Sequence, residues 1–198
     1  MINRAREVLK EYYGYDSFRE RQEEIITSIL DGKDVVTIMP TGGGKSICYQ
    51  VPALILDGLT IVISPLISLM KDQVDNIKNM GIKSAYINST LSENEIKSIL
   101  NDVIKNEVKI LYVAPERLES TEFLNLITRV KISQIAVDEA HCISQWGHDF
   151  RSSYRRISKF IDLLVYRPII TAFTATATDE VRRDIINLLR LNEPKIFI

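Results

Sequence analysis

Residues 35–46 read VVTIMPTGGGKS, and this stretch sets the expectation for the rest of the chain. Its apolar, β-branched start predicts a buried strand, and the segment that follows from Lys45 predicts a helix. Three consecutive glycines between them let backbone N–H groups approach a polyphosphate without obstruction from Cβ atoms. The helix N-terminus adds partial positive charge, Lys45 can reach the outer phosphates, and the Ser46 hydroxyl can bind Mg²⁺. The stretch therefore predicts a phosphate-binding loop.

The loop departs from the strict pattern G-x-x-x-x-G-K-[ST], because Met39 stands where that pattern has its first glycine. The alternative is a glycine turn that happens to end in Lys-Ser. A strand before the loop and a helix after it favour the phosphate-binding interpretation. The candidate nucleotide-binding residues here are Thr41, Gly42, Gly43, Gly44, Lys45 and Ser46.

Short apolar runs alternate with amphipathic segments along the whole chain. The runs predict strands at 35–39, 59–64, 83–87, 110–113, 132–137, 169–174 and 195–198. The amphipathic segments predict helices at 20–30, 45–56, 67–80, 93–105, 123–130, 154–164 and 179–191. Such alternation is typical of βαβ units, so we expect an α/β fold with a mostly parallel sheet flanked by helices on both faces. Ligands of these sheets bind at the carboxyl ends of the strands.

Composition narrows the function classes. The 198 residues suit one domain, and 25 Lys plus Arg against 26 Asp plus Glu exclude a histone-like protein that binds nucleic acid by bulk charge. No apolar run approaches the roughly 20 residues of a membrane span, so no membrane association and a cytoplasmic location are expected. Cys48 and Cys142 belong to no CxxC pair or Cys/His cluster, which predicts buried core thiols rather than a disulfide framework or a zinc site.

A second candidate segment, VDEAH at residues 137–141, ends a predicted strand. Hydrolysis of a nucleoside triphosphate requires a carboxylate for the metal ion and a base for the attacking water. Asp138 suits the first role, as an oxygen ligand of Mg²⁺, and Glu139 suits the second. Taken alone, Asp-Glu after a strand is as typical of a helix start with favourable charges. Together with the phosphate loop, the pair favours nucleotide hydrolysis.

Several segments together resemble a known family. Motifs I, II and III of superfamily 2 helicases are similar to residues 40–46, 138–141 and 174–176. The resemblance narrows to the RecQ family of DNA helicases at residues 64–73, 114–118 and 144–151, and at Leu9, Tyr13, Gly14, Phe18, Arg19 and Gln22. It extends from about Leu9 to the last residues. It implies a RecA-like P-loop NTPase fold, with ATP and Mg²⁺ as cofactors.

The resemblance also implies roles for the N-terminal residues. Residues 1–31 would form an adenine-recognition segment, in which Tyr15 stacks on the base while Arg19 and Gln22 contact the base or its surroundings. The residues by themselves favour the alternative, surface packing of a helical segment.

DNA contacts are implied at Ser68, Lys71, Trp146, Phe150 and Arg151. Aromatic rings stack on bases of any sequence, and cations and hydroxyls hold phosphates. The alternatives are core packing for the two aromatic residues and an ordinary N-capped helix for residues 64–73. The remaining assignment makes His141 a catalytic residue, with Thr174 and Thr176 coupling the two ligands.

Relatives of this family carry a second RecA-like lobe with arginine fingers, followed by zinc-binding and winged-helix regions. We therefore expect residues 1–198 to be the first lobe of a 3′–5′ DNA helicase of recombination and repair, with single-stranded and duplex DNA and the second lobe as partners. Alone, this lobe should bind ATP, hydrolyse it poorly and not unwind DNA. Two alternatives stay open. One is an RNA helicase, because Asp-Glu-Ala-His also occurs in RNA-dependent relatives; the other is a nucleotide-gated nucleic-acid-binding module, against which Glu139 argues.

Overall fold

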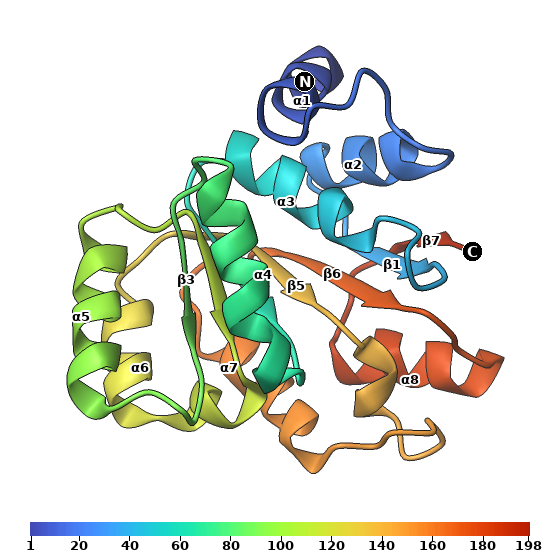
Figure 1. The fold of residues 1–198 in the computed structure, drawn as a ribbon. Coiled ribbons are helices and arrows are strands. Elements are labelled where there is room, and N and C mark those ends of the chain that lie inside the picture. The colour runs from blue at the N-terminus through green and yellow to red at the C-terminus, as the bar shows by residue number, and fades with distance from the viewer.

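All 198 residues are described by the computed structural model, which contains one seven-stranded, fully parallel sheet (Figure 1). The strands are β1 (Val35–Ile38), β2 (Leu59–Ile63), β3 (Ser84–Ile87), β4 (Ile110–Val113), β5 (Ile132–Val137), β6 (Ile169–Thr174) and β7 (Lys195–Phe197). Their order across the sheet is β3-β4-β2-β5-β6-β1-β7. The predicted α/β fold with a parallel sheet is confirmed, and each predicted strand ends within one residue of its observed limits.

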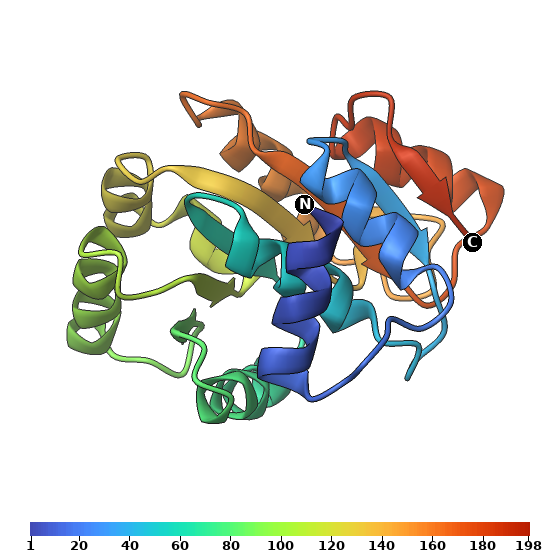
Figure 2. The same ribbon diagram turned by 90° about the horizontal axis from the view of Figure 1, so that it is seen from above.

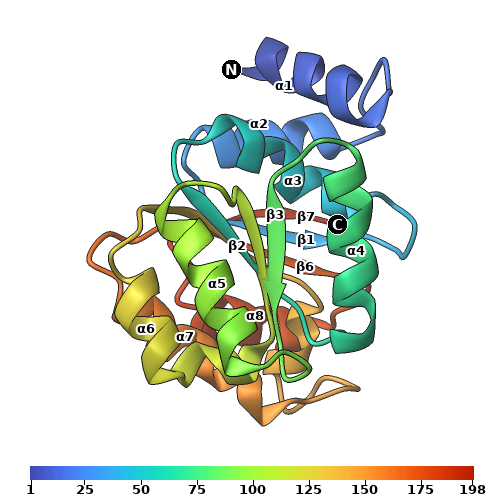
Figure 3. The ribbon, with the colours of Figure 1, turned by 60° about the vertical axis from the view of Figure 1, so that its left-hand side comes forward.

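Helices cover both faces of the sheet. They are α1 (Ile2–Val8), α2 (Gln22–Leu30), α3 (Lys45–Ile55), α4 (Ile67–Asn79), α5 (Glu93–Ile104), α6 (Thr121–Ile127), α7 (Arg156–Asp162) and α8 (Asp179–Leu188). Helices α2, α3 and α4 lie on one face of the sheet and α5 to α8 on the other (Figure 3). Their buried side chains form the core on the two faces. Strands covered on both faces must be apolar throughout, which explains their continuous Val, Ile and Leu runs. No helix of the chain has both the length and the apolarity needed to cross a bilayer.

The N-terminal segment lies outside the two main layers. Helix α1 packs over α2 and α3 (Figure 2) and continues into a π-helical turn, Leu9–Tyr13. The Tyr13 hydroxyl donates to Gln50 Oε1 at 2.9 Å, and Gln50 Nε2 donates to the Tyr112 hydroxyl at 2.9 Å. This chain of buried hydrogen bonds ties the segment through α3 to β4, and so holds residues 14–22 against the end of the sheet that carries the glycine loop.

A buried carboxylate fastens the opposite end of the sheet. Asp34 is 3% exposed and lies just before β1. Its oxygens accept from the Ile170 N–H at 2.9 Å, from the Asn192 N–H at 2.7 Å and from the Arg167 guanidinium. The starts of β1 and β6 and the approach to β7 are thereby joined at one side chain.

Replacing this carboxylate should destabilise the chain. Asp34→Ala removes the acceptor of the buried Ile170 N–H, of the Asn192 N–H and of the Arg167 guanidinium, so we expect the free energy of unfolding to fall by about 3 kcal/mol. Urea denaturation followed by circular dichroism measures the change. Lys33→Ala is the matched control, because that neighbouring side chain is exposed. A loss for Asp34→Ala no larger than for the control would contradict the role given to Asp34.

Candidate functional site

Three neighbouring strands bring the candidate residues to one edge of the sheet. Strand β1 pairs with β6, and β6 pairs with β5, all in parallel. The Met39 N–H, just after β1, donates to the carbonyl of Thr174 at 2.9 Å. The glycine loop, the acidic pair after β5 and the end of β6 therefore meet at the carboxyl edge, where ligands of parallel sheets bind.

The glycine loop is shaped for close approach of a ligand to its backbone. Gly42 and Gly44 have φ of +81° and +85°, in the region that side chains disfavour. A Cβ on Gly43 would lie 2.5 Å from Met39 Cγ and 2.9 Å from the Pro40 carbonyl oxygen. Met39 itself belongs to the core beneath the loop, which explains a larger residue where the strict pattern has glycine. The loop ends directly in α3, whose first residue, Lys45, donates from Nζ to the Met39 carbonyl at 3.1 Å.

Residues of the N-terminal segment support this loop. The Arg19 guanidinium donates to the Gly42 carbonyl at 2.8 Å, and Gln22 Nε2 donates to the Gly44 carbonyl at 3.1 Å. Gln22 is buried, while Tyr15 is half exposed. The structure thus places Arg19 and Gln22 against the loop itself, a contact that the sequence analysis did not foresee. The base contacts expected for these residues remain a prediction.

Asp138 is a half-buried residue whose carboxylate has few partners. Its Oδ1 accepts from the Glu139 N–H at 3.0 Å, and its carbonyl accepts from the Tyr154 hydroxyl at 2.8 Å. Burial, reinforced by the charge of Glu139, raises the pKa of Asp138 from 3.8 to about 6, against the opposing effect of Lys45. Glu139 has a φ of +48°, which is unusual for a residue with a side chain. A half-buried carboxylate with few hydrogen bonds, beside a lysine and a glycine loop, is suited to a divalent cation.

His141 connects the acidic pair to the end of β6. Thr174 has one hydroxyl proton, which it donates to the Thr176 carbonyl at 3.0 Å. Its oxygen must therefore accept the 2.8 Å hydrogen bond from His141 Nδ1. The same Nδ1 lies 3.4 Å from a Glu139 carboxylate oxygen. Burial lowers the pKa of His141, which favours the neutral ring with its proton on Nδ1.

Residues 144–151, here named the aromatic loop, begin directly after this histidine's turn, Ala140–Ile143. Trp146 is 76% exposed and Phe150 is 38% exposed, so the surface-loop interpretation holds over core packing. The Ser144 hydroxyl donates to Asp184 of α8 at 2.6 Å and accepts from the Trp146 N–H at 3.1 Å. The ring of His148 stacks on that of His141 with centroids 4.3 Å apart. The aromatic loop is thus anchored on α8 and contacts His141 through the ring of His148.

Two further predicted residues lie on α4. Ser68 and Lys71 are both exposed, near the end of α4 that follows β2. Residue Leu66 precedes the helix and provides no side-chain cap, so the interpretation as an ordinary N-capped helix is not supported. The first-turn N–H groups and both side chains lie at the same edge of the sheet as the glycine loop.

Sequence reasoning missed several partners of the site. Tyr154 and Asp184 contact it from 16 and 40 residues away, and no local pattern signals such contacts. The expectation that Cys142 belongs to no Cys/His cluster was wrong. Its Sγ lies 3.8 Å from both His141 Nε2 and Asp149 Oδ2, and the adjacent histidine was the available signal. Both cysteines are buried and free, as predicted.

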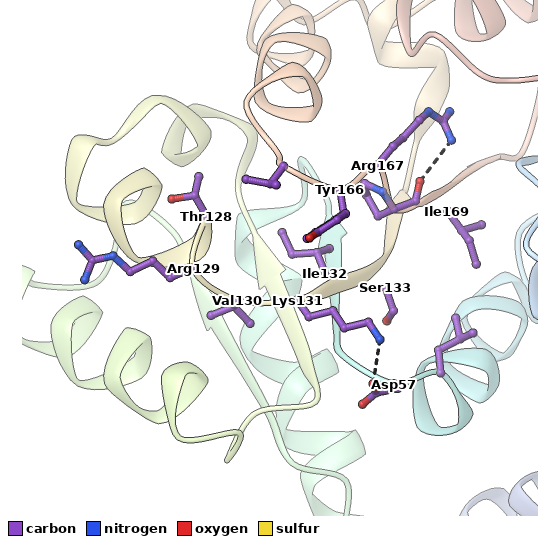
Figure 4. A pocket seen from close by; sticks show the side chains of 13 residues that line it. Asp57, Thr128, Arg129, Val130, Lys131, Ile132, Ser133, Tyr166, Arg167 and Ile169 are labelled. Atoms are coloured by element: carbon purple, nitrogen blue, oxygen red, sulfur yellow. Dashed lines mark hydrogen bonds and ion pairs between the residues drawn. The ribbon is translucent and has the colours of Figure 1, made fainter.

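A cavity of about 720 Å³ lies away from all these groups (Figure 4). Its lining includes Leu56, Val130, Ile132, Tyr166 and Ile169, which precede or begin β2, β5 and β6. It therefore opens at the amino edge of the sheet, opposite the glycine loop. Size alone does not make it the reactive site.

The raised pKa of Asp138 predicts that its ionised carboxylate lowers the free energy of unfolding. A raised pKa means that the folded chain binds this proton more tightly than the unfolded chain, so ionised Asp138 lowers stability above pH 6 and the effect vanishes below about pH 4. Asp138→Asn should therefore raise the free energy of unfolding by about 1–3 kcal/mol at pH 8 and by little at pH 4.

Denaturant unfolding across this pH range measures the effect. Asp75→Asn, on the exposed surface of α4, makes the same change in net charge and should leave stability within about 0.5 kcal/mol. A gain at pH 8 that is equal in both variants would argue against a buried-charge penalty at Asp138.

Comparisons with known proteins agree with this geometry. Residues 19–184 match the family model described as "DEAD/DEAH box helicase". The chain is 52% identical over 98% of its length to the ATP-dependent DNA helicase RecQ of Bacillus subtilis (strain 168), and 49% identical over 98% to that of Pasteurella multocida (strain Pm70). It covers 33% and 30% of those proteins, so it spans about one third of the curated relatives it matches.

Solved structures share the fold at lower sequence identity. A hypothetical ATP-dependent RNA helicase from Sulfolobus tokodaii superposes with a TM-score of 0.75 at 24% identity, covering 100% of this chain and 57% of that one. The DUF1998 helicase MrfA bound to DNA and AMPPNP superposes with a TM-score of 0.77 at 20% identity, covering 98% and 29%. These likenesses establish the RecA-like helicase fold of the domain.

Proposed function

We propose, since the chain belongs to the DEAD/DEAH box helicase family, that it is the first RecA-like lobe of an ATP-dependent DNA helicase of the RecQ type. The observation that carries the proposal is the meeting of three features at one sheet edge. The glycine loop with Lys45, the acidic pair with His141, and the aromatic loop all lie there within a few hydrogen bonds of one another.

The glycine loop would hold the phosphates of ATP. The backbone N–H groups of Thr41, Gly42 and Gly44 and the N-terminus of α3 would provide the anion site, and Lys45 Nζ would exchange the Met39 carbonyl for a phosphate oxygen. Tyr15 would offer its half-exposed ring to adenine. Arg19 and Gln22 would act mainly by stabilising the conformation of the glycine loop, because both donate hydrogen bonds to its carbonyl groups.

The acidic pair would perform the hydrolysis. Ser46 and Asp138 fit the magnesium ion, which when bound neutralises charge on the phosphates. Glu139 would accept the proton of the attacking water. Glu139 has an unusual backbone conformation, and its carboxylate lies 3.4 Å from His141 Nδ1. His141 would therefore position the carboxylate that accepts the proton.

DNA would bind along the same edge of the sheet and change the rate of ATP hydrolysis. Exposed Trp146 offers a stacking surface, and Ser68, Lys71 and the first turn of α4 offer phosphate contacts. Movement of the aromatic loop would displace His148 from His141, and so alter the hydrogen bonds of His141 to Thr174 and Glu139. This short path supports a lobe in which DNA contact regulates turnover.

We further propose that a second RecA-like lobe is needed for helicase activity. Two lobes that close on ATP and open after hydrolysis would grip DNA alternately and move 3′ to 5′, in recombination and repair, as the RecQ resemblance implies. An arginine finger from a second lobe is worth 10³–10⁵ in rate, so this lobe alone should turn over ATP poorly.

Single-turnover ATP hydrolysis tests the proposal, with and without single-stranded DNA. We expect DNA-stimulated hydrolysis only when the chain is extended by about one more domain of the parent protein. Stimulated unwinding by residues 1–198 alone would refute the two-lobe proposal. An absence of stimulation in both proteins would favour a nucleotide-gated binding module.

The role of Glu139 can be isolated in the extended protein. Glu139→Gln should reduce turnover by at least about 100-fold while leaving ATP affinity nearly unchanged, because it removes the proton acceptor and keeps the side-chain shape. A fluorescent ATP analogue reports the affinity. Glu24→Gln, on the exposed side of α2, is the charge-matched control. Surviving turnover in Glu139→Gln would show that another group activates the water.

The chain has a single tryptophan, so its fluorescence reports on the aromatic loop alone. We expect single-stranded DNA to quench Trp146 emission. Trp146→Ala should weaken binding by roughly 5- to 150-fold, the equivalent of 1–3 kcal/mol of base stacking, as measured by anisotropy of labelled DNA. Tyr166→Ala is the control, because that exposed ring lies at the opposite edge. Equal losses in both variants would remove the aromatic loop from the binding site.

One relative favours a second candidate substrate. The protein named "Putative ATP-dependent RNA helicase R290" of Acanthamoeba polyphaga mimivirus is 46% identical over 96% of this chain. The same anisotropy assay, run as a competition, distinguishes the two. Displacement of labelled DNA by RNA at equal or lower concentration would favour an RNA helicase.

A further inference from the structure

We infer that His141, Cys142 and Asp149 form a binding site for a thiophilic divalent cation such as Zn²⁺ or Cd²⁺, which shares His141 with the site proposed for nucleotide but uses the other ring nitrogen. One donor atom of each residue, a ring nitrogen, the sulfur and a carboxylate oxygen, lies within 4.8 Å of the other two. The sulfur is 3.8 Å from the nitrogen and 3.8 Å from the oxygen. Tetrahedral zinc with bonds of about 2.0–2.3 Å separates its ligands by about 3.5 Å, so small adjustments suffice.

The hydrogen bonds of His141 leave the right nitrogen free. Because the Thr174 proton is directed to Thr176, His141 must carry its own proton on Nδ1. The neutral ring then presents the lone pair of Nε2 toward the sulfur of Cys142. A histidine that binds metal commonly donates its other N–H to a fixed oxygen, and Thr174 already provides that oxygen.

A cation bound between these three residues would replace the thiol proton of Cys142. Cys142 has one S–H proton and two acceptors within reach, the nitrogen of His141 and the carboxylate of Asp149. Metal binding would form a bond from sulfur to the cation and release this proton to solvent, with no change of oxidation state. Nitrogen, thiolate and carboxylate are the donors that zinc prefers, and three of them leave a fourth position for water.

Solvent reaches the cluster from the side of Asp149. The side chain of Asp149 is 49% exposed and is paired with the 39% exposed Arg151. A cation could enter there by displacing the guanidinium, although the sulfur itself is buried. The bound ion would fix Asp149 of the aromatic loop to His141. If the proposed function holds, such an ion would inhibit DNA-stimulated ATP hydrolysis by immobilising the loop.

Cadmium titration of residues 1–198 tests the site without any activity assay. Thiolate bound to Cd²⁺ gives an ultraviolet charge-transfer band, and we expect this band to saturate at one ion per chain. Zn²⁺ should displace Cd²⁺ and abolish the band. No charge-transfer band in the folded chain, at a Cd²⁺ concentration well above that of the protein, would overturn the proposal.

Variants identify the ligands. Cys142→Ser should abolish the band, whereas Cys48→Ser should retain it, which makes the other buried cysteine the matched control. Asp149→Asn changes only an exposed position, keeps the fold, and should weaken Cd²⁺ binding by about 10-fold or more. A band that persists in Cys142→Ser, disappears in Cys48→Ser or is unaffected in Asp149→Asn would refute the assignment. These outcomes are independent of whether the chain hydrolyses ATP.

Discussion

Strands β5, β6 and β1 lie side by side and point in one direction, and every reactive group of the chain depends on this arrangement. Each strand ends in a segment that continues the chain away from the sheet, so three segments far apart in sequence emerge together. The glycine loop follows β1, the acidic pair follows β5, and Thr174 ends β6. A register shift by one residue would turn each of these side chains to the other face of the sheet.

Two aspartates, the buried Asp34 and the half-buried Asp138, show how this fold separates stability from reactivity. Asp34 lies at the amino edge and accepts from two backbone N–H groups and a guanidinium, which satisfies its charge. Asp138 lies at the carboxyl edge, where its carboxylate accepts from one backbone N–H, and burial raises its pKa to about 6. The carboxylate of Asp34 stabilises the fold by joining the starts of β1 and β6 to the approach to β7. The carboxylate of Asp138 is left with unused lone pairs, which is the condition for binding a cation.

Local patterns in the sequence were sufficient for the elements but not for their contacts. Apolar runs predicted all seven strands. In β1 to β6 this is because largely buried strands have no polar alternation to obscure them, whereas β7 is an exposed edge strand. The glycine loop was predicted because its chemistry lies in consecutive residues. By contrast, Thr174 contacts His141 across 33 residues, and Arg19 braces Gly42 across 23. Such contacts follow from tertiary packing, which the periodicity of the sequence does not encode. The family resemblance indicated which residues belong to the site, but not the hydrogen bonds that they form.

The two ring nitrogens of His141 contact different parts of the site, so this residue links the acidic pair to the aromatic loop. Nδ1 faces Thr174 and Glu139, on the side of the glycine loop, while Nε2 faces Cys142 and the aromatic loop. A single ring cannot change its protonation or its tilt on one side without changing its bond on the other. In the proposed function, a stacked base or a bound cation that repositions the aromatic loop would therefore act on Glu139 through one rigid group rather than through a long chain of contacts.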